Sequence, residues 1–234
     1  MTIDRRRLAR GTTLACWAGF FAWLQLSGEK TRYLGPRTYW VIVFGALVLG
    51  AAAAAHLLTL RASAPHRLER RDVTALATLL LPLLVVAAVP SAQLGALAAS
   101  RKTSGAGAAA VGAIAPPAPD PDARVSFVDV HYASESESYA AEAGIAEGME
   151  VELTGFVTHP AGLPPGTVGL TRFQVSCCAA DAVPYTVPIT VDPHSRSDDE
   201  WLRVRGHLAV RDGIFVLDPI EVDAVDAPSD PYLY

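Results

Sequence analysis

The sequence predicts two regions of different class: an α-helical membrane region over 1–100 and an all-β domain over 124–234, joined by a linker over 101–123. Three observations predict this division. Half of the residues (51%) are hydrophobic, only 18% are charged, and mean hydropathy is +0.27, which is more apolar than a typical soluble domain. Long apolar stretches fall in the first region, and alternating apolar residues fall in the last. Most of the 24 acidic residues, which give the net charge of −5, lie beyond residue 120.

Apolar stretches at 12–27, 40–60 and 73–99 are the candidate membrane spans. About 20 apolar residues are needed to cross a hydrocarbon layer of about 30 Å, so the second and third stretches are long enough and the first is close to the limit. The arginines before the first stretch resemble those of a signal peptide, but "SGEK" follows it in place of a small-residue cleavage site. We therefore expect about three retained transmembrane helices in contact with membrane lipid.

Basic residues in the short flanking segments predict the orientation. Four arginines lie in 1–11 and four in 61–71, against three basic residues in 28–39. Positive residues favour the cytoplasmic side. We expect a multi-pass protein of the cell membrane with its N-terminus in the cytoplasm and its C-terminal domain on the extracytoplasmic side.

The linker is rich in Gly, Ala and Pro, which is typical of a flexible tether. Beyond it, apolar residues alternate with period two, the pattern of half-buried strands. Asp212-Gly213 predicts a hairpin turn, and Gly155 and Gly206 interrupt strands where a small barrel bends. We expect a small OB-like barrel, with a β-sandwich as the alternative, and a short helix over 138–148. The predicted strands are 149–159, 170–178, 184–191, 200–210 and 213–225.

Cys177 and Cys178 are adjacent in a chain that has one other cysteine, Cys16. If the strand continues through them, Cys177 points into the core with Phe173 and Val175, while Cys178 points outward. Three interpretations remain open. The pair is structural; or it binds a metal with Asp181, joined by a histidine; or it forms a vicinal disulfide or reactive thiol in an oxidising compartment. In the metal interpretation, His159 or His207 supplies the further ligand.

Recognised catalytic and nucleic-acid-binding patterns are missing from the sequence. It contains no G-x-S-x-G, Walker or H-E-x-x-H pattern, and no cluster of Lys and Arg in the acidic C-terminal half. We therefore expect neither an enzyme nor a nucleic-acid-binding protein.

The strings "GFVTHP", "LTRFQVSCCAADAVPYTV" and "WLRVRGHL", after an N-terminal membrane region, resemble the bacterial YcgQ family. The resemblance implies a membrane subunit that acts with a separate multi-spanning YcgR-type permease and has a connection to metal homeostasis, with zinc as the implied ion. Within the matching string it carries over Cys177, Cys178 and Asp181 as functional residues.

The leading hypothesis from the sequence is a membrane-anchored accessory subunit whose outer domain presents a Cys/Asp site to a metal ion or a permease. The metal ligands expected are Cys177, Cys178, Asp181 and His159. An alternative from another class is a structural or interaction module with inert thiols. A thiol-redox enzyme is the weakest option, because the chain lacks a Cys-x-x-Cys motif.

Overall fold

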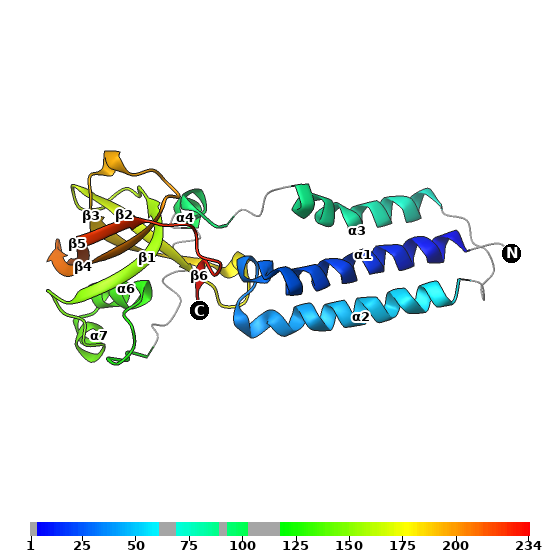
Figure 1. Ribbon diagram of the computed structural model, residues 1–234, viewed down its shortest axis with the longest axis horizontal. Coiled ribbons are helices and arrows are strands. Elements are labelled where there is room, and N and C mark those ends of the chain that lie inside the picture. The colour runs from blue at the N-terminus through cyan, green and yellow to red at the C-terminus, as the bar shows by residue number, and fades with distance from the viewer. Residues whose placement is uncertain (1–3, 61–68, 89–92, 103–117) are drawn as a thin grey trace. The chain divides into compact units, whose positions relative to one another are not determined.

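A computed structural model describes residues 4–60, 69–88, 93–102 and 118–234, and divides the chain into two compact units, Met1–Ala92 and Gln93–Tyr234. Each unit is described by itself (Figure 1). Most of the predicted linker lies outside the described residues, as does most of the basic loop used for the orientation.

The first unit is helical. Its main helices are α1 (Arg5–Ser27), α2 (Tyr39–Leu58) and α3 (Arg70–Ala88), with the short 3₁₀ helices η1 (Glu29–Arg32) and η2 (Pro36–Thr38) between α1 and α2. Asp4 caps the N-terminus of α1, because its carboxylate accepts hydrogen bonds from the Arg6 and Arg7 backbone N–H groups. Gly28 caps the C-terminus in the left-handed conformation (φ 78°). Local capping therefore explains both ends of α1.

Two of the described segments, Pro36–Leu58 and Arg70–Ala88, are helices long and apolar enough to cross a membrane. Their side chains face outward: Trp40, Leu47 and Leu84 are all more than half exposed, as expected for helices that contact lipid. Helix α1 covers the remaining predicted span but does not meet the same criterion, so its crossing stays a prediction.

Small residues allow the helices of this unit to approach closely. A Cβ atom at Gly11 would lie 3.0 Å from the Leu57 side chain, and one at Gly45 would lie 3.3 Å from Phe21. The ion pair between Arg6 and Asp72, at 2.8 Å, joins α1 to α3.

The second unit contains a closed β-barrel, which confirms the predicted fold class (Figure 1). Strand β1 pairs with both β4 and β2, so the sheet closes on itself; the strand order is β1-β4-β5-β3-β2, and only the β3–β5 pairing within the barrel is parallel. This is the arrangement of an OB-like barrel. The strands are β1 (Glu150–Thr158), β2 (Thr167–Gln174), β3 (Val183–Thr190), β4 (Trp201–Arg211), β5 (Ile214–Ala224) and the short β6 (Tyr232–Leu233), which pairs in parallel with β2.

The predicted turn and strand glycines have clear structural reasons. Asp212 and Gly213 both have positive φ (53° and 80°) and connect β4 to β5 in a tight hairpin. At Gly206 the β4–β5 register shifts, and a Cβ atom would collide with the backbone oxygen of Asp218. At Gly155 a Cβ atom would lie 2.7 Å from the Thr171 carbonyl oxygen. Both strand glycines thus allow backbones to approach where the barrel closes or bends.

In the described part of this unit, the α-helices α4 (Ala96–Lys102), α6 (Phe127–Glu135) and α7 (Glu137–Glu142) accompany the barrel. Helix α7 overlaps the first part of the helix predicted over 138–148 but ends at Glu142, while α4 and α6 were not predicted. Helix α6 begins with a capping box in which Ser126 and Asp129 satisfy each other's backbone N–H groups.

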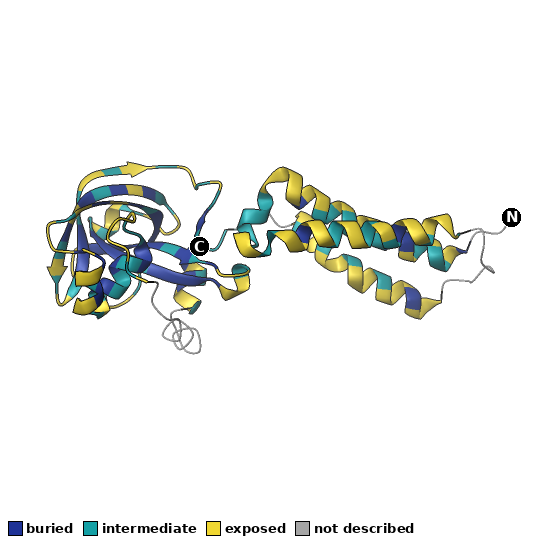
Figure 2. Ribbon diagram, turned by 90° about the horizontal axis from the view of Figure 1, so that it is seen from below, coloured by how far each residue is buried: buried dark blue, intermediate teal, exposed yellow. Residues whose placement is uncertain are grey.

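Buried side chains of the described residues form two clusters in the barrel unit. Figure 2 colours the buried residues dark blue, and many of them lie on the strands. The larger cluster fills the barrel and is covered by α6 and α7. The smaller one, called here the β2-end cluster, lies where β2 finishes. Its buried members are Ala99, Phe156, Phe173, Val175, Ala182 and Tyr232.

Candidate metal centre

The two adjacent cysteines lie in an exposed turn immediately after β2. The strand ends at Gln174, and Val175 and Ala182, only 1% and 2% exposed, fix the two ends of the turn in the β2-end cluster. Between them the chain comes to the surface, where Cys177 is exposed and Cys178 is half-buried. The prediction that Cys177 points into the core was wrong, because strand alternation stops before it is reached.

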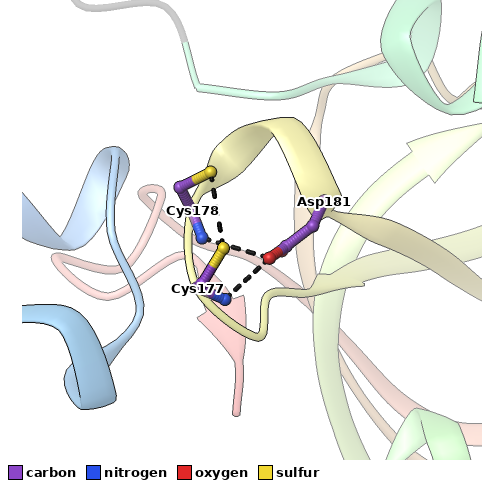
Figure 3. A group of neighbouring side chains, drawn as sticks. All are labelled: Cys177, Cys178 and Asp181. Atoms are coloured by element: carbon purple, nitrogen blue, oxygen red, sulfur yellow. Dashed lines mark hydrogen bonds between the residues drawn. The ribbon is translucent and has the colours of Figure 1, made fainter.

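Asp181 organises this turn. One carboxylate oxygen, Oδ1, accepts a hydrogen bond from the Ser176 N–H at 3.0 Å. The other, Oδ2, accepts from the N–H groups of Cys177 at 2.7 Å and Cys178 at 3.3 Å (Figure 3). The residues Ala179–Asp181 form a 3₁₀ turn, closed by a 2.9 Å bond from the Asp181 N–H to the Cys178 carbonyl. One side chain therefore orders the backbone of both cysteines.

This turn brings three metal-ligating side chains together. The sulfur atoms of Cys177 and Cys178 are 3.7 Å apart, and neither cysteine is in a disulfide. The two sulfurs and a carboxylate oxygen of Asp181 all lie within 4.8 Å of one another. Figure 3 shows the three side chains converging on one side of the turn. Thiolate and carboxylate are both zinc ligands.

Hydrogen bonding sets the charge state of the group. The bond to the Asp181 carboxylate, followed by the contact with Cys178 and by burial, raises the pKa of the Cys177 thiol to about 11. Burial alone would raise the pKa of Asp181, but hydrogen bonds from Cys177 and from the three backbone N–H groups lower it below its ordinary value. At neutral pH Cys177 therefore holds its proton while Asp181 is ionised, so a metal ion has to displace a proton to bind.

His159, the fourth predicted ligand, lies elsewhere. It follows β1, and its ring nitrogens face other acceptors: Nδ1 is 2.8 Å from an Asp198 carboxylate oxygen and Nε2 is 3.1 Å from the Pro193 carbonyl oxygen. It lines a pocket of about 630 Å³ that includes none of the three turn residues. His207 is exposed on β4. Among the described residues the structure thus brings together Cys177, Cys178 and Asp181, without either histidine.

Helix α4 and strand β6 support the turn, and sequence reasoning missed most of this support. The Lys102 ammonium group at the end of α4 donates to the Ala180 carbonyl at 3.0 Å. The Val175 N–H donates to Leu233 in β6 at 2.9 Å. The aromatic tail after Asp230 was the available signal for β6, since aromatic residues at a chain end often pack against the domain.

Arg172, in β2, holds the tail in place. Its guanidinium donates to the carbonyl oxygens of Asp230 at 2.8 Å and Pro231 at 3.3 Å, and lies over the Trp201 ring. Burial lowers the pKa of the Arg172 guanidinium, and the negative charge of Asp230 raises it; the effect of burial is the larger.

Comparison with protein families places the turn inside a family domain. The family described as the DUF1980 C-terminal domain matches residues 118–234, which include the whole barrel, Cys177, Cys178 and Asp181. No curated protein matches the chain. Because the DUF1980 match covers half of the 234 residues, the chain belongs to the DUF1980 family.

Proposed function

We propose that this protein is a membrane-anchored accessory subunit of a permease, whose barrel domain binds a thiophilic metal ion, zinc in the first place, through Cys177, Cys178 and Asp181. The observation that carries the metal part is the spacing of the two sulfurs. Two sulfurs 3.7 Å apart, each about 2.3 Å from one zinc ion, subtend an angle of about 107°, which is close to the tetrahedral value.

The donor set also favours one class of metal over others. Ca²⁺ and Mg²⁺ prefer six or more oxygen ligands, whereas this turn offers two sulfurs and one carboxylate. A linear two-thiolate complex with the same bond length needs sulfurs about 4.6 Å apart, wider than the observed 3.7 Å. The turn therefore fits a tetrahedral, thiophilic divalent ion best.

The membrane role draws on different evidence. Two helices of the first unit have the length and composition of membrane spans, and the flanking arginines favour a cytoplasmic N-terminus. With three crossings the barrel lies outside the cell membrane. The permease partner is supported by the resemblance of the CCAADA string to the YcgQ family. No reaction is assigned to the protein.

Metal titration of the full-length chain in detergent tests the metal site. We expect one Zn²⁺ to bind per chain, with the loss of at least a hundredfold in affinity in Cys177→Ser and in Cys178→Ser. Cys16→Ser is the matched control, because Cys16 lies in α1 and belongs to the other unit. Failure to bind zinc, or binding that survives both substitutions, would overturn the metal assignment.

Accessibility in whole cells tests the orientation. A membrane-impermeant maleimide should label Cys177 in intact cells that carry Cys16→Ser. Labelling only after the cells are opened would place the barrel in the cytoplasm. Co-purification of a YcgR-type permease, co-expressed with the wild-type chain in the same membrane, tests the partner.

A specific observation favours an interaction module as the second candidate. The Asp181 carboxylate already accepts hydrogen bonds from three backbone N–H groups, which is sufficient reason for an Asp in this turn without a metal. If Asp181 has only this structural role, Asp181→Asn will loosen the turn. In that case the thiols of the wild-type chain will bind no metal ion. The zinc titration decides between the two candidates.

A further inference from the structure

The three donors of the turn make an incomplete coordination set. They come from one five-residue segment, and within the described part of the chain no further Cys, His, Asp or Glu joins them. Structural zinc sites are four-coordinate and closed by protein ligands, whereas sites with three protein ligands keep one position for an exchangeable group. A zinc ion held by Cys177, Cys178 and Asp181 thus keeps one open position.

That open position faces solvent. Cys177 and Asp181 are exposed and Cys178 is half-buried, so the ion would lie at the surface of the turn. The three side chains converge on one another at the turn (Figure 3). A donor atom of another molecule can therefore reach the ion without any opening of the barrel.

Contacts within the protein also hold the turn. Val175 and Ala182 anchor its ends in the β2-end cluster, and Asp181 fixes its backbone through three hydrogen bonds. In domains such as zinc fingers, metal binding supplies the folding free energy and removal of the metal unfolds the chain. Here buried anchors and hydrogen bonds within the protein hold the turn, so we expect the donors to stay in place when the ion leaves.

From these three features we infer that the turn is a metal-exchange site, which receives a thiophilic divalent ion and passes it to a partner that carries thiol or imidazole donors. This inference rests on the proposed function. A partner donor binds the ion at the open position first; the bond between the ion and one turn sulfur then breaks. If the partner donor is a thiol, its proton goes to the departing sulfur, so charge and protons balance and nothing is oxidised or reduced.

The order of ligand exchange is the property to measure. Full-length chain in detergent is loaded with one Zn²⁺ and mixed with an excess of a chromogenic zinc chelator in a stopped-flow instrument. We expect the transfer rate to rise in proportion to the chelator concentration, because the chelator attacks the bound ion directly. A rate independent of chelator concentration would mean that the ion leaves first, and would overturn the exchange site while leaving zinc binding intact.

A substitution that closes the open position provides a second test. Ala180→Cys places a third thiol in Cys-x-x-Cys spacing with Cys177 in the same turn, and Ala180→Ser is its matched control. We expect transfer from Ala180→Cys to slow at least tenfold, with Ala180→Ser unchanged. Equal transfer rates in the two variants would contradict an open position.

Circular dichroism of the wild-type chain gives a readout that does not involve transfer. We expect the β signal and its thermal midpoint to be the same before and after removal of zinc with a chelator. A barrel that unfolds when zinc is removed would make this a structural site and overturn the inference. Absence of zinc binding in the titration would instead refute the proposed function itself.

Discussion

The hydrogen bond between the Cys177 thiol and the Asp181 carboxylate should control how fast Cys177 reacts. The perturbation is Asp181→Asn, which removes the negative charge and keeps the size of the side chain. It is made in a chain with Cys16→Ser and Cys178→Ser, so that Cys177 is the only thiol. We expect Cys177 to react with an aromatic disulfide reagent up to about tenfold faster at pH 7.

The magnitude follows from the pKa of Cys177. Asp181 is the largest contributor to the rise from the ordinary value of 9.0 to about 11, so a full return gives about a hundredfold more thiolate at pH 7. A thiolate of lower pKa is also a weaker nucleophile, by a factor of about eight for two pKa units at a Brønsted coefficient of about 0.45. A hundredfold gain in thiolate and an eightfold loss in nucleophilicity combine to a reaction rate that is about tenfold higher. This is an upper limit, because Cys178 and burial contribute to the raised pKa and solvent screens an exposed pair.

The assay is the rate of reagent release as a function of pH. With Asp181 in place the rate should still rise steeply at pH 10, whereas with Asn its midpoint should fall near pH 9 and the rate should level off above pH 10. Asp192→Asn is the control, because Asp192 accepts a hydrogen bond from the His194 N–H in a turn after β3 that contains no thiol. Equal rates and equal pH midpoints with Asp and Asn at position 181 would refute the assigned role of the carboxylate.

Three further outcomes are expected. Gly206→Ala, whose Cβ would collide with the Asp218 carbonyl oxygen, should lower the free energy of unfolding by about 1–3 kcal/mol in urea, while Val210→Ala at an exposed position changes it by less. Arg172→Met, which removes two hydrogen bonds to the tail, should make carboxypeptidase release of the last residues severalfold faster. Between pH 6 and 7.5 the zinc dissociation constant should fall at least tenfold per pH unit, measured by titration, since the Cys177 thiol keeps its proton in this range until the metal binds.

Local patterns predicted the barrel well. Strand alternation located five strands to within a few residues, since each face of a barrel strand meets a different environment. The Asp212-Gly213 turn and the bulge at Gly206 were also predictable, because both depend on backbone conformations that few residues adopt.

The site was predictable only in part. The sequence brought together Cys177, Cys178 and Asp181 because they are neighbours in the chain. It placed Cys177 in the core because no local signal marks Gln174 as the end of β2. That end is set by tertiary contacts.

Those contacts come from segments far away in the chain. The Val175 N–H pairs with Leu233 in β6, and the Ala180 carbonyl accepts from Lys102 in α4. Neither partner can be identified by periodicity, because α4 and β6 are too short to show one.

Exposure and rigidity are separate requirements of the candidate site, and different residues of the turn meet them. Val175 and Ala182 lose almost all contact with water and hold the two ends of the turn, so the donors between them can be exposed without being mobile. Asp181 serves both requirements, since its carboxylate holds the backbone and also faces the sulfurs. An ionised carboxyl group has about four acceptor sites, and three backbone N–H groups use three of them. The Cys177 thiol uses the fourth site and frees it for one metal bond when it gives up its proton. The turn can therefore bind an ion without losing the backbone hydrogen bonds that shape it.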